Sequence, residues 1–418
     1  MSAGVRTTTF LVAAVLLAAP LGAGSSFAED TVKIGYAGAL TGPVSYLGND
    51  MRRGAEMAIE KINAGGGVRG RKLELVVRDD EHDPVKTVAS YRQLIERQNV
   101  VAMMGATNSA AMLAVTPLLN DQFKIPTICV HTDANDIINN QAAKEKRDSY
   151  LFRLGMFGRG QADFLVDSMV KTFGLQKIAL LTWTSGWGTI GRHELTRRLG
   201  ELGMTPVADE TFDSGDTDMT AQLLKIKAAG ADVILNYSTV PEAVAIFKSQ
   251  RKVGGTPTPF ASAWGIAVPA LYKAGGDLID GTINSNVVTV DGPQPPARQA
   301  AIEAYRAKYK QDFDEPAGYF DAYDAMGLFA AVMEKVGFEP EAIRAGLENL
   351  PSFHGLVLDV DRPPFTHDQH DSFTGKDMML GRWTSGKFLK IAADNGALYV
   401  SPSGSDKAFI DPKTFALK

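Results

Sequence analysis

The chain has 418 residues, of which 45% are hydrophobic and 22% are charged, the composition of a globular protein. Its formal net charge of -5 argues against nucleic acid and anionic membrane surfaces as partners. The only cysteine, Cys129, cannot form a disulfide within the chain. Because it lies near the end of the apolar run 125–130, we expect a small buried core residue rather than a reactive thiol.

The first 28 residues predict a secretory signal peptide. Arg6 is the only charged residue before Glu29, an apolar run covers residues 10–21, and Ser26 and Ala28 are small. The apolar run is too short to span a membrane. We therefore expect cleavage after Ala28 and export to the periplasm without insertion into the membrane. Roughly 390 residues would remain, enough for two domains.

The mature chain begins with a predicted β-strand, α-helix and second β-strand. The first strand covers residues 32–36 and is followed by a turn at Gly42 and Pro43. The helix carries apolar residues at helical spacing and ends at the glycines 65–67, and residues 73–77 form the next strand. The pattern predicts a βαβ unit.

Strand and helix patterns continue to alternate along the chain. Further strands are expected at residues 100–104, 125–130, 177–182, 232–235 and 260–261, with an extended segment at 281–288. Further helices are expected at 110–119, 189–202 and 241–249, and one more is expected to turn Leu223, Leu224 and Ile226 inward. This alternation predicts an α/β protein with parallel sheets and right-handed crossovers.

Two loops that follow predicted strands could form one wall of a binding site, because ligands of open parallel sheets lie beyond the carboxyl ends of the strands. Residues 105–109 lead directly into a helix, so its free N–H groups and the Ser109 hydroxyl could bind a carboxylate. Ser109 could equally be a simple N-cap. The loop 131–133 could add a hydroxyl, an N–H group and a carboxylate, or be an ordinary turn.

Aromatic residues follow other predicted strands and could form the opposite wall. Trp183 and Trp187 follow the strand 177–182, Tyr237 follows 232–235, and Trp264 follows 260–261. An indole in a loop could contact a ligand, because its N–H group needs a partner and loops are shallow. Each indole could equally cover the core of its lobe.

The segment 33–84, with its turn and helix, closely resembles the N-terminus of bacterial solute-binding proteins of the leucine/isoleucine/valine-binding family, and the resemblance extends over the mature chain. It implies a two-lobed type I periplasmic-binding fold, in which each lobe is a mainly parallel sheet flanked by helices. The chain would cross between lobes near residues 151–154, 284–288 and 356–361. Lobe 1 would contain residues 29–152 and 287–357, and lobe 2 residues 153–286 and 358–418.

The resemblance also implies a set of ligand-binding residues. The matching positions on the first lobe are Tyr46, Leu47, Asn108, Ser109, His131, Thr132 and Asp133. Those on the second lobe are Trp187, Ser238, Thr239, Trp264 and Gly265. Trp264 stands where amino-acid-binding members often carry an acidic residue for the ammonium group, and Asp133 could take over that role. A cysteine pair that some members have is replaced by His82 and Asn108.

A protein of this kind binds without catalysis, and the resemblance implies a monomer that needs no cofactor and passes its solute to the membrane permease of an ABC importer. We expect a carboxylate-bearing solute, namely a branched-chain or hydrophobic amino acid. An aromatic carboxylic acid or an amide is the alternative, as is a sensory role. A secreted enzyme on the same frame is disfavoured, because no nucleophile–base or metal constellation is evident.

Three apparent motifs are discounted. The glycines 65–70 fit G-x-G-x-x-G, but they follow a helix and precede a strand, the reverse of a dinucleotide-binding loop. His367 and His370 lack further converging metal ligands. The acidic run 79–83 lacks the spacing of a calcium loop, and we expect a solvated turn in which Asp83 caps the next helix.

Overall fold

The computed structural model describes residues 1–4, 31–184, 186–402 and 406–418. The chain separates into two compact units, residues 1–30 and residues 31–418, and the fold below is that of the second unit. The expected signal peptide lies almost entirely outside the described residues. In the described part of the chain, no helix combines the length and the apolar character needed to cross a bilayer.

The first sheet has five parallel strands in the order β2-β1-β3-β4-β5. The strands are β1 (Val32–Gly38), β2 (Leu73–Asp79), β3 (Ala102–Met104), β4 (Thr127–Cys129) and β5 (Leu151–Arg153). The helices between them are α1 (Ser45–Ala64), α2 (Pro84–Gln98), α3 (Ser109–Pro117) with the π-helical turn η1 (Leu118–Phe123), α4 (Asn135–Ile138) and α5 (Gln141–Lys144). The predicted βαβ unit is therefore present as β1, α1 and β2.

The second sheet has seven strands in the order β14-β13-β10-β9-β8-β6-β7. Five neighbouring strands, β10, β9, β8, β6 and β7, are paired in parallel, and β13 is antiparallel to both β10 and β14. The strands are β6 (Ile178–Trp183), β7 (Ala208–Phe212), β8 (Val233–Tyr237), β9 (Phe260–Ser262), β10 (Ile283–Asn286), β13 (Met379–Thr384) and β14 (Lys387–Lys390). The helices are α6 (Gly158–Asp167) with η2 (Ser168–Thr172), α7 (Gly186–Glu201), α8 (Thr220–Ala228), α9 (Val240–Val253), η3 (Trp264–Ile266), α10 (Pro269–Gly275) and η4 (Gly276–Ile279).

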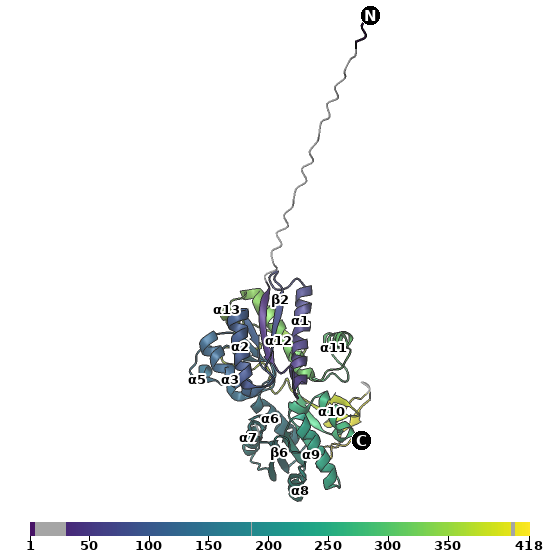
Figure 1. Ribbon diagram of the computed structural model, residues 1–418. Helices are drawn as coiled ribbons and strands as arrows, with labels where there is room; N and C mark the ends of the chain where they lie inside the picture. The colour runs from purple at the N-terminus through teal and green to yellow at the C-terminus, as the bar shows by residue number, and fades with distance from the viewer. Residues whose placement is uncertain (5–30, 185, 403–405) are drawn as a thin grey trace. The chain divides into compact units, whose positions relative to one another are not determined.

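After β10 the chain leaves the second sheet and later returns to it. It forms α11 (Pro296–Tyr309), α12 (Pro316–Val336), α13 (Pro340–Glu348) and the short pair β11 (Phe353–His354) and β12 (Asp359–Val360), and then enters β13. Helix α12 lies beside α1 of the first sheet (Figure 1). A small sheet of β15 (Ala392–Asp394), β16 (Ala397–Val400) and β17 (Ala408–Phe409) follows β14. This is the two-lobed α/β architecture that the sequence predicted, while the exact lobe boundaries remain a prediction.

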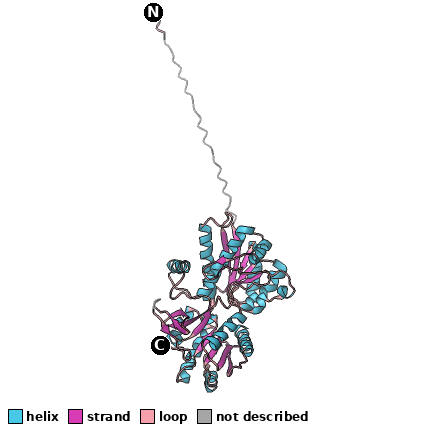
Figure 2. Ribbon diagram, turned by 180° about the vertical axis from the view of Figure 1, so that it is seen from behind, coloured by secondary structure: helices cyan, strands magenta, loops and turns pink. Residues whose placement is uncertain are grey.

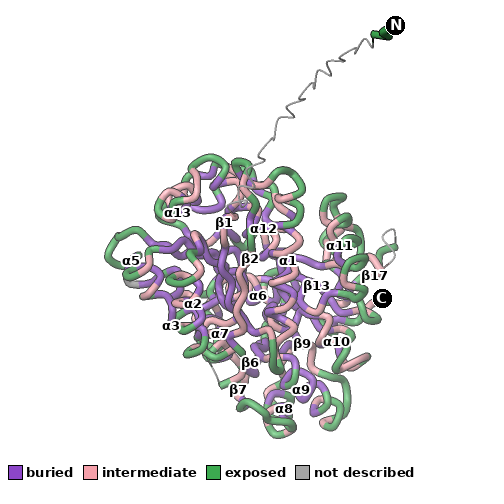
Figure 3. The backbone as a smooth tube through the Cα atoms, turned by 45° about the horizontal axis from the view of Figure 1, so that its top comes forward, coloured by how far each residue is buried: buried purple, intermediate pink, exposed green. Residues whose placement is uncertain are grey.

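The core forms where the helices cover the sheets, whose strands are magenta in Figure 2 and mostly buried in Figure 3. The apolar face expected for helix α1 consists of Met51, Ala55, Ala58, Ile59 and Ile62; the first four are buried and Ile62 is partly buried. Gly54 allows α1 to approach α12 closely, because a Cβ atom there would overlap the carbonyl oxygen of Tyr319. Cys129 is fully buried, as predicted, and burial raises the pKa of its thiol to about 12.

Some local predictions were wrong. Leu224 is 52% exposed, whereas Leu223 and Ile226 are buried, because neighbouring helix positions point about 100° apart and cannot both face the core.

The acidic run 79–83 is only partly as predicted. Asp83 caps α2 as predicted, its carboxylate accepting from the N–H groups of Val85 and Lys86. Asp80, expected in a solvated turn, is buried and accepts hydrogen bonds from the His82 amide and the Thr87 hydroxyl.

Candidate ligand-binding site

A cavity of about 340 Å³ lies between the carboxyl ends of the two sheets. Loops that follow β1, β2, β3 and β4 form one wall, and loops that follow β6, β7, β8 and β9 form the other. The lining residues are Pro43, Val44, Tyr46, Leu47, His82, Thr107, Asn108, Ser109, His131, Asp133, Trp183, Trp187, Ser214, Thr239, Pro241, Glu242, Trp264 and Gly265. Ligands of parallel sheets bind at such a position.

The first wall is organised by Ser109 and Asp133. Asn108, not Ser109, caps helix α3, because the Asn108 side-chain oxygen accepts from the amide of Ala111 at 2.7 Å. The Ser109 hydroxyl donates instead to an Asp133 carboxylate oxygen at 2.9 Å and accepts from the amides of Asp133 and Ala134. The interpretation of Ser109 as an N-cap is therefore wrong, and its only hydroxyl proton is already used by a carboxylate of the protein.

Asp133 also joins the two walls. Its second carboxylate oxygen accepts a hydrogen bond from the indole N–H of Trp187. Asp133 is buried, and this burial raises its carboxyl pKa to about 6, while the Ser109 hydroxyl, Arg153 and the Trp187 indole act in the opposite direction. The side chain is thus mainly ionised at neutral pH.

Aromatic rings form much of the remaining lining. The Trp264 ring stacks on His131 across the two walls, with ring centroids 4.3 Å apart. Trp187 packs against Tyr237 at 5.0 Å and lies over Gly265, where a Cβ atom would overlap the indole ring. Gly265 is therefore needed for the position of Trp187, which gives a physical reason for glycine in this loop.

Glu242 is a lining residue that the sequence analysis missed. It lies in the first turn of α9, is only 6% exposed, and accepts a hydrogen bond from the Thr239 hydroxyl. In the sequence it looks like any acidic residue that favours a helix N-terminus after Pro241. The sequence offered one indication of Glu242, because it lies three positions after Thr239, which was already a candidate in the loop after β8.

The cavity has an excess of negative charge. Asp133 and Glu242 are its two carboxylates, and no Lys or Arg is among the lining residues in the described part of the chain. Burial lowers the pKa of His131 to about 4 and also lowers that of His82, so both imidazoles are neutral at pH 7. This charge balance favours a cationic group on the ligand.

Ten of the twelve candidate residues lie on this cavity, and Thr132 and Ser238 do not. Both side chains are buried beneath it, and the Ser238 hydroxyl donates to the side-chain oxygen of Asn236 at 2.6 Å. Residues of the cavity outside those twelve include His82, Thr107, Trp183 and Ser214. Of these, Trp183 and the loop that contains Thr107 had been predicted as parts of the two walls.

Two of the discounted motifs, the histidines near residue 370 and the glycines 65–70, have structural roles. His370 is buried, its Nδ1 lies 2.7 Å from the carbonyl oxygen of Leu151, and its Nε2 lies 3.1 Å from Glu348. Among the residues that the structure describes, no group of three or more His, Cys, Asp and Glu side chains is arranged to hold a metal. Gly66, Gly67 and Gly70 have positive φ angles, as required in a turn between α1 and β2.

The fold and the cavity define a two-lobed solute-binding protein. A family model described as periplasmic binding protein matches residues 31–388, so the chain belongs to the periplasmic binding protein family. This is a family of binding proteins and not of enzymes.

Curated relatives agree with this assignment, and solved structures have the same fold. Leu/Ile/Val-binding protein homolog 7 of Brucella abortus is 26% identical over 396 residues, covering 92% of this chain and 96% of that protein. A periplasmic binding protein type 1 of Bordetella pertussis has a TM-score of 0.75 at 21% identity, covering 91% of this chain and 99% of that one. The branched-chain amino acid transporter substrate binding protein LivJ of Streptococcus pneumoniae, solved with isoleucine, has a TM-score of 0.74 at 22% identity, covering 86% and 97%.

Proposed function

We propose that this protein is the periplasmic solute-binding component of an ABC importer, and that it captures a small hydrophobic amino acid mainly through the ammonium group. The names of its relatives support the transport role and the class of solute. The observation that carries the choice of recognised group is the pair of carboxylates, Asp133 and Glu242, in a cavity whose described lining has no Lys or Arg.

The ammonium group is the part of an amino acid that this cavity suits best. An ammonium ion that leaves water without a counter-charge is strongly disfavoured, so a cavity that binds one needs carboxylates. Asp133 on the first wall and Glu242 on the second provide them. The rings of Trp187 and Trp264 add a surface to which a cation is attracted.

The carboxylate end of the solute has a weaker site. The Ser109 hydroxyl, the expected donor to that carboxylate, already donates to Asp133. A solute carboxylate would approach Asp133 and would have to be held by backbone N–H groups near the start of α3. This competition favours a second candidate, an amine or amide that lacks a free carboxylate. It disfavours an aromatic carboxylic acid.

The rest of the solute is small and apolar. A cavity of about 340 Å³ is at the lower end of the range for ligand sites, about 300–1,000 Å³. Tyr46 and Leu47 from the start of α1 and Trp183 from the end of β6 supply apolar surface for a branched or aromatic side chain.

Hinged closure of the two lobes is the mechanism we propose. The solute would bind first to the wall around Ser109 and Asp133, and the wall with Trp187 and Trp264 would then close over it. Closure is favoured only to the extent that the solute binds the closed form better than the open one. The structure contains contacts from Trp187 to Asp133 and from Trp264 to His131, and such contacts between the walls would help to stabilise a closed form. The closed monomer would then dock on a membrane permease.

Calorimetry with matched ligands tests the recognised group. Leucine has both charged groups, leucinamide lacks the carboxylate, and 4-methylpentanoate lacks the amine; phenylalanine, phenylalaninamide and 3-phenylpropionate form the aromatic set. We expect the amines to bind and the two acids to bind at least about a hundredfold more weakly. Glu242→Gln should weaken amine binding by about tenfold or more. The matched control is Glu303→Gln, which changes an exposed glutamate of α11 that does not line the cavity.

An acid that binds as tightly as its amino acid would contradict recognition through the ammonium group. Leucinamide that binds more tightly than leucine would select the second candidate. A sensory role would be indicated if deletion of the gene left uptake of the bound solute unchanged.

A further inference from the structure

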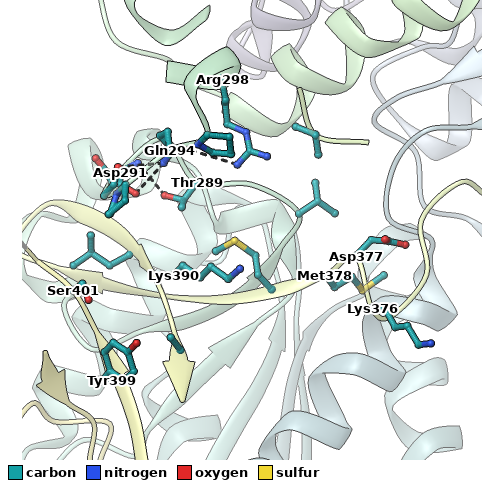
Figure 4. Close-up of a pocket in the computed structure, with 18 residues that line it drawn as sticks. Thr289, Asp291, Gln294, Arg298, Lys376, Asp377, Met378, Lys390, Tyr399 and Ser401 are labelled. Atoms are coloured by element: carbon teal, nitrogen blue, oxygen red, sulfur yellow. Dashed lines mark hydrogen bonds between the residues drawn. The ribbon is translucent and has the colours of Figure 1, made fainter. Parts of the chain in front are cut away.

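A second cavity has a volume of about 450 Å³ (Figure 4). Three parts of the chain form it: the segment after β10, the segment that enters β13, and the strands β14 to β16. Its lining residues are Val287, Thr289, Asp291, Gly292, Pro293, Gln294, Pro295, Arg298, Val357, Lys376, Asp377, Met378, Met379, Leu389, Lys390, Ala392, Tyr399 and Ser401. None of these residues lines the first cavity.

Unpaired positive charge distinguishes this cavity. Arg298, Lys376 and Lys390 form no ion pair with any described residue. The Arg298 guanidinium makes only neutral hydrogen bonds, from Nε to the Leu356 carbonyl oxygen at 2.8 Å and from Nη1 to the Gln294 side-chain oxygen at 3.4 Å. Figure 4 shows Arg298 and Lys390 on opposite sides of the cavity.

The two carboxylates of the lining do not neutralise these cations. Asp377 is paired with Arg362 at 2.9 Å and accepts from the amide and hydroxyl of Thr374. Asp291 accepts from the amide of Phe388 at 2.8 Å, and burial raises its carboxyl pKa. Outside the lining, Asp324 and Asp359 interact electrostatically with Arg298, but neither forms an ion pair with it. The lining itself therefore keeps an excess of positive charge, with three cations against two carboxylates that are already engaged.

The cavity lies where the chain passes between the two sheets. Residues 287–295 connect β10 of the second sheet to α11, which contains Arg298 and from which the chain continues into α12 beside α1 of the first sheet. Val357 and residues 376–379 belong to the returning segment, which ends in β13. A molecule bound here would contact both passages at once.

We propose that this cavity is a second binding site that takes a small polyvalent anion, either a phosphate or a di- or tricarboxylate. Arg298 and Lys390 bind the anion from opposite sides, and Lys376 contributes a third positive charge. The Tyr399 and Ser401 hydroxyls are neutral donors on the same lining. Phosphate and carboxylate oxygens match such donors because charge-assisted hydrogen bonds are the strong ones.

Thermal unfolding of the mature protein, with no solute in the first cavity, tests this site. Sodium phosphate and sodium citrate are titrated separately at constant ionic strength, with sodium chloride making up the balance. An anion that binds the native state raises the melting temperature in a saturable way. The variants are Lys390→Gln and the control Lys387→Gln, whose exposed lysine is on the same strand but not on the cavity.

We expect phosphate or citrate to stabilise the parent and Lys387→Gln equally, and the apparent affinity of Lys390→Gln to be about tenfold weaker. The arm with the larger effect identifies the class of anion. No stabilisation beyond that by chloride would overturn the proposal, and so would equal stabilisation of all three proteins. Because both lysines are exposed, neither substitution is expected to impair folding. A negative result here leaves the proposed solute of the first cavity untouched.

Discussion

At the scale of a single residue, if Asp133 binds the ammonium group as proposed, it should make ligand binding sensitive to pH. Its pKa of about 6 is above the ordinary value, so the buried carboxylate gains a proton as the pH falls through 6. Loss of that charge removes a partner of the bound ammonium group, so protonation and amine binding oppose each other.

Affinity for an amine that stays protonated throughout should therefore fall by about tenfold between pH 7 and pH 5. Asp133→Asn should bind more weakly at pH 7 and lose most of this pH dependence, because its side chain does not titrate. Calorimetry at several pH values measures both effects. The exposed Asp136→Asn serves as the control and should behave like the parent; an unchanged pH profile in Asp133→Asn would rule out Asp133 as the group responsible.

The contact between Gly265 and Trp187 gives a second prediction for single residues. Gly265→Ala places a methyl group where the indole lies, so the ring must move away from Asp133. We expect solute affinity to fall by about tenfold in Gly265→Ala. Trp187→Ala removes the ring entirely and should reduce the binding free energy by roughly 2–4 kcal/mol.

Melting temperatures should change less than solute affinity in these two variants, because the ring is only partly buried and packs at the edge of the core. Binding that equals that of the parent in Trp187→Ala would place the indole outside the ligand site.

At the scale of elements, the packing of α1 on α12 depends on Gly54. Gly54→Ala should destabilise the protein by about 1–3 kcal/mol, because the new methyl group overlaps a backbone oxygen of α12 that cannot move aside easily. Gly200→Ala near the end of α7 is the matched control: it meets no atom within 4 Å, and alanine favours a helix by up to about 1 kcal/mol. Urea unfolding should thus shift in opposite directions, and shifts of the same sign would contradict the packing argument.

Elements were also the level at which the sequence was most informative. Alternating strands and helices predicted the parallel sheets, and the loops after the strands contained most of the residues that line the cavity. Isolated errors had local causes, as for Leu224, where a run of two leucines does not say which one faces inward. The bond from Ser109 to Asp133 joins residues 24 positions apart, and that of Trp187 to Asp133 spans 54, so neither could be read from local patterns. Glu242 was missed because its sequence context is that of an ordinary helix start.

For the whole molecule, export is the prediction that remains open. If the leader is removed after Ala28, protein isolated from the periplasm should begin at Glu29, because small residues precede that bond. Intact-mass analysis together with N-terminal sequencing measures this directly. Recovery of the chain in the membrane fraction with Met1 retained would contradict both the cleavage site and the periplasmic location.

The distribution of tryptophan gives the protein a built-in optical reporter. Three of the four indoles, Trp183, Trp187 and Trp264, line the candidate site, and the fourth, Trp383, is buried in the second sheet at 1% exposure. Emission from Trp383 should be a constant background, while emission from the other three should change in wavelength and intensity as water leaves the cavity and the rings come together. Solute capture could then be followed in real time by intrinsic fluorescence, without attaching a dye that would perturb the closing lobes.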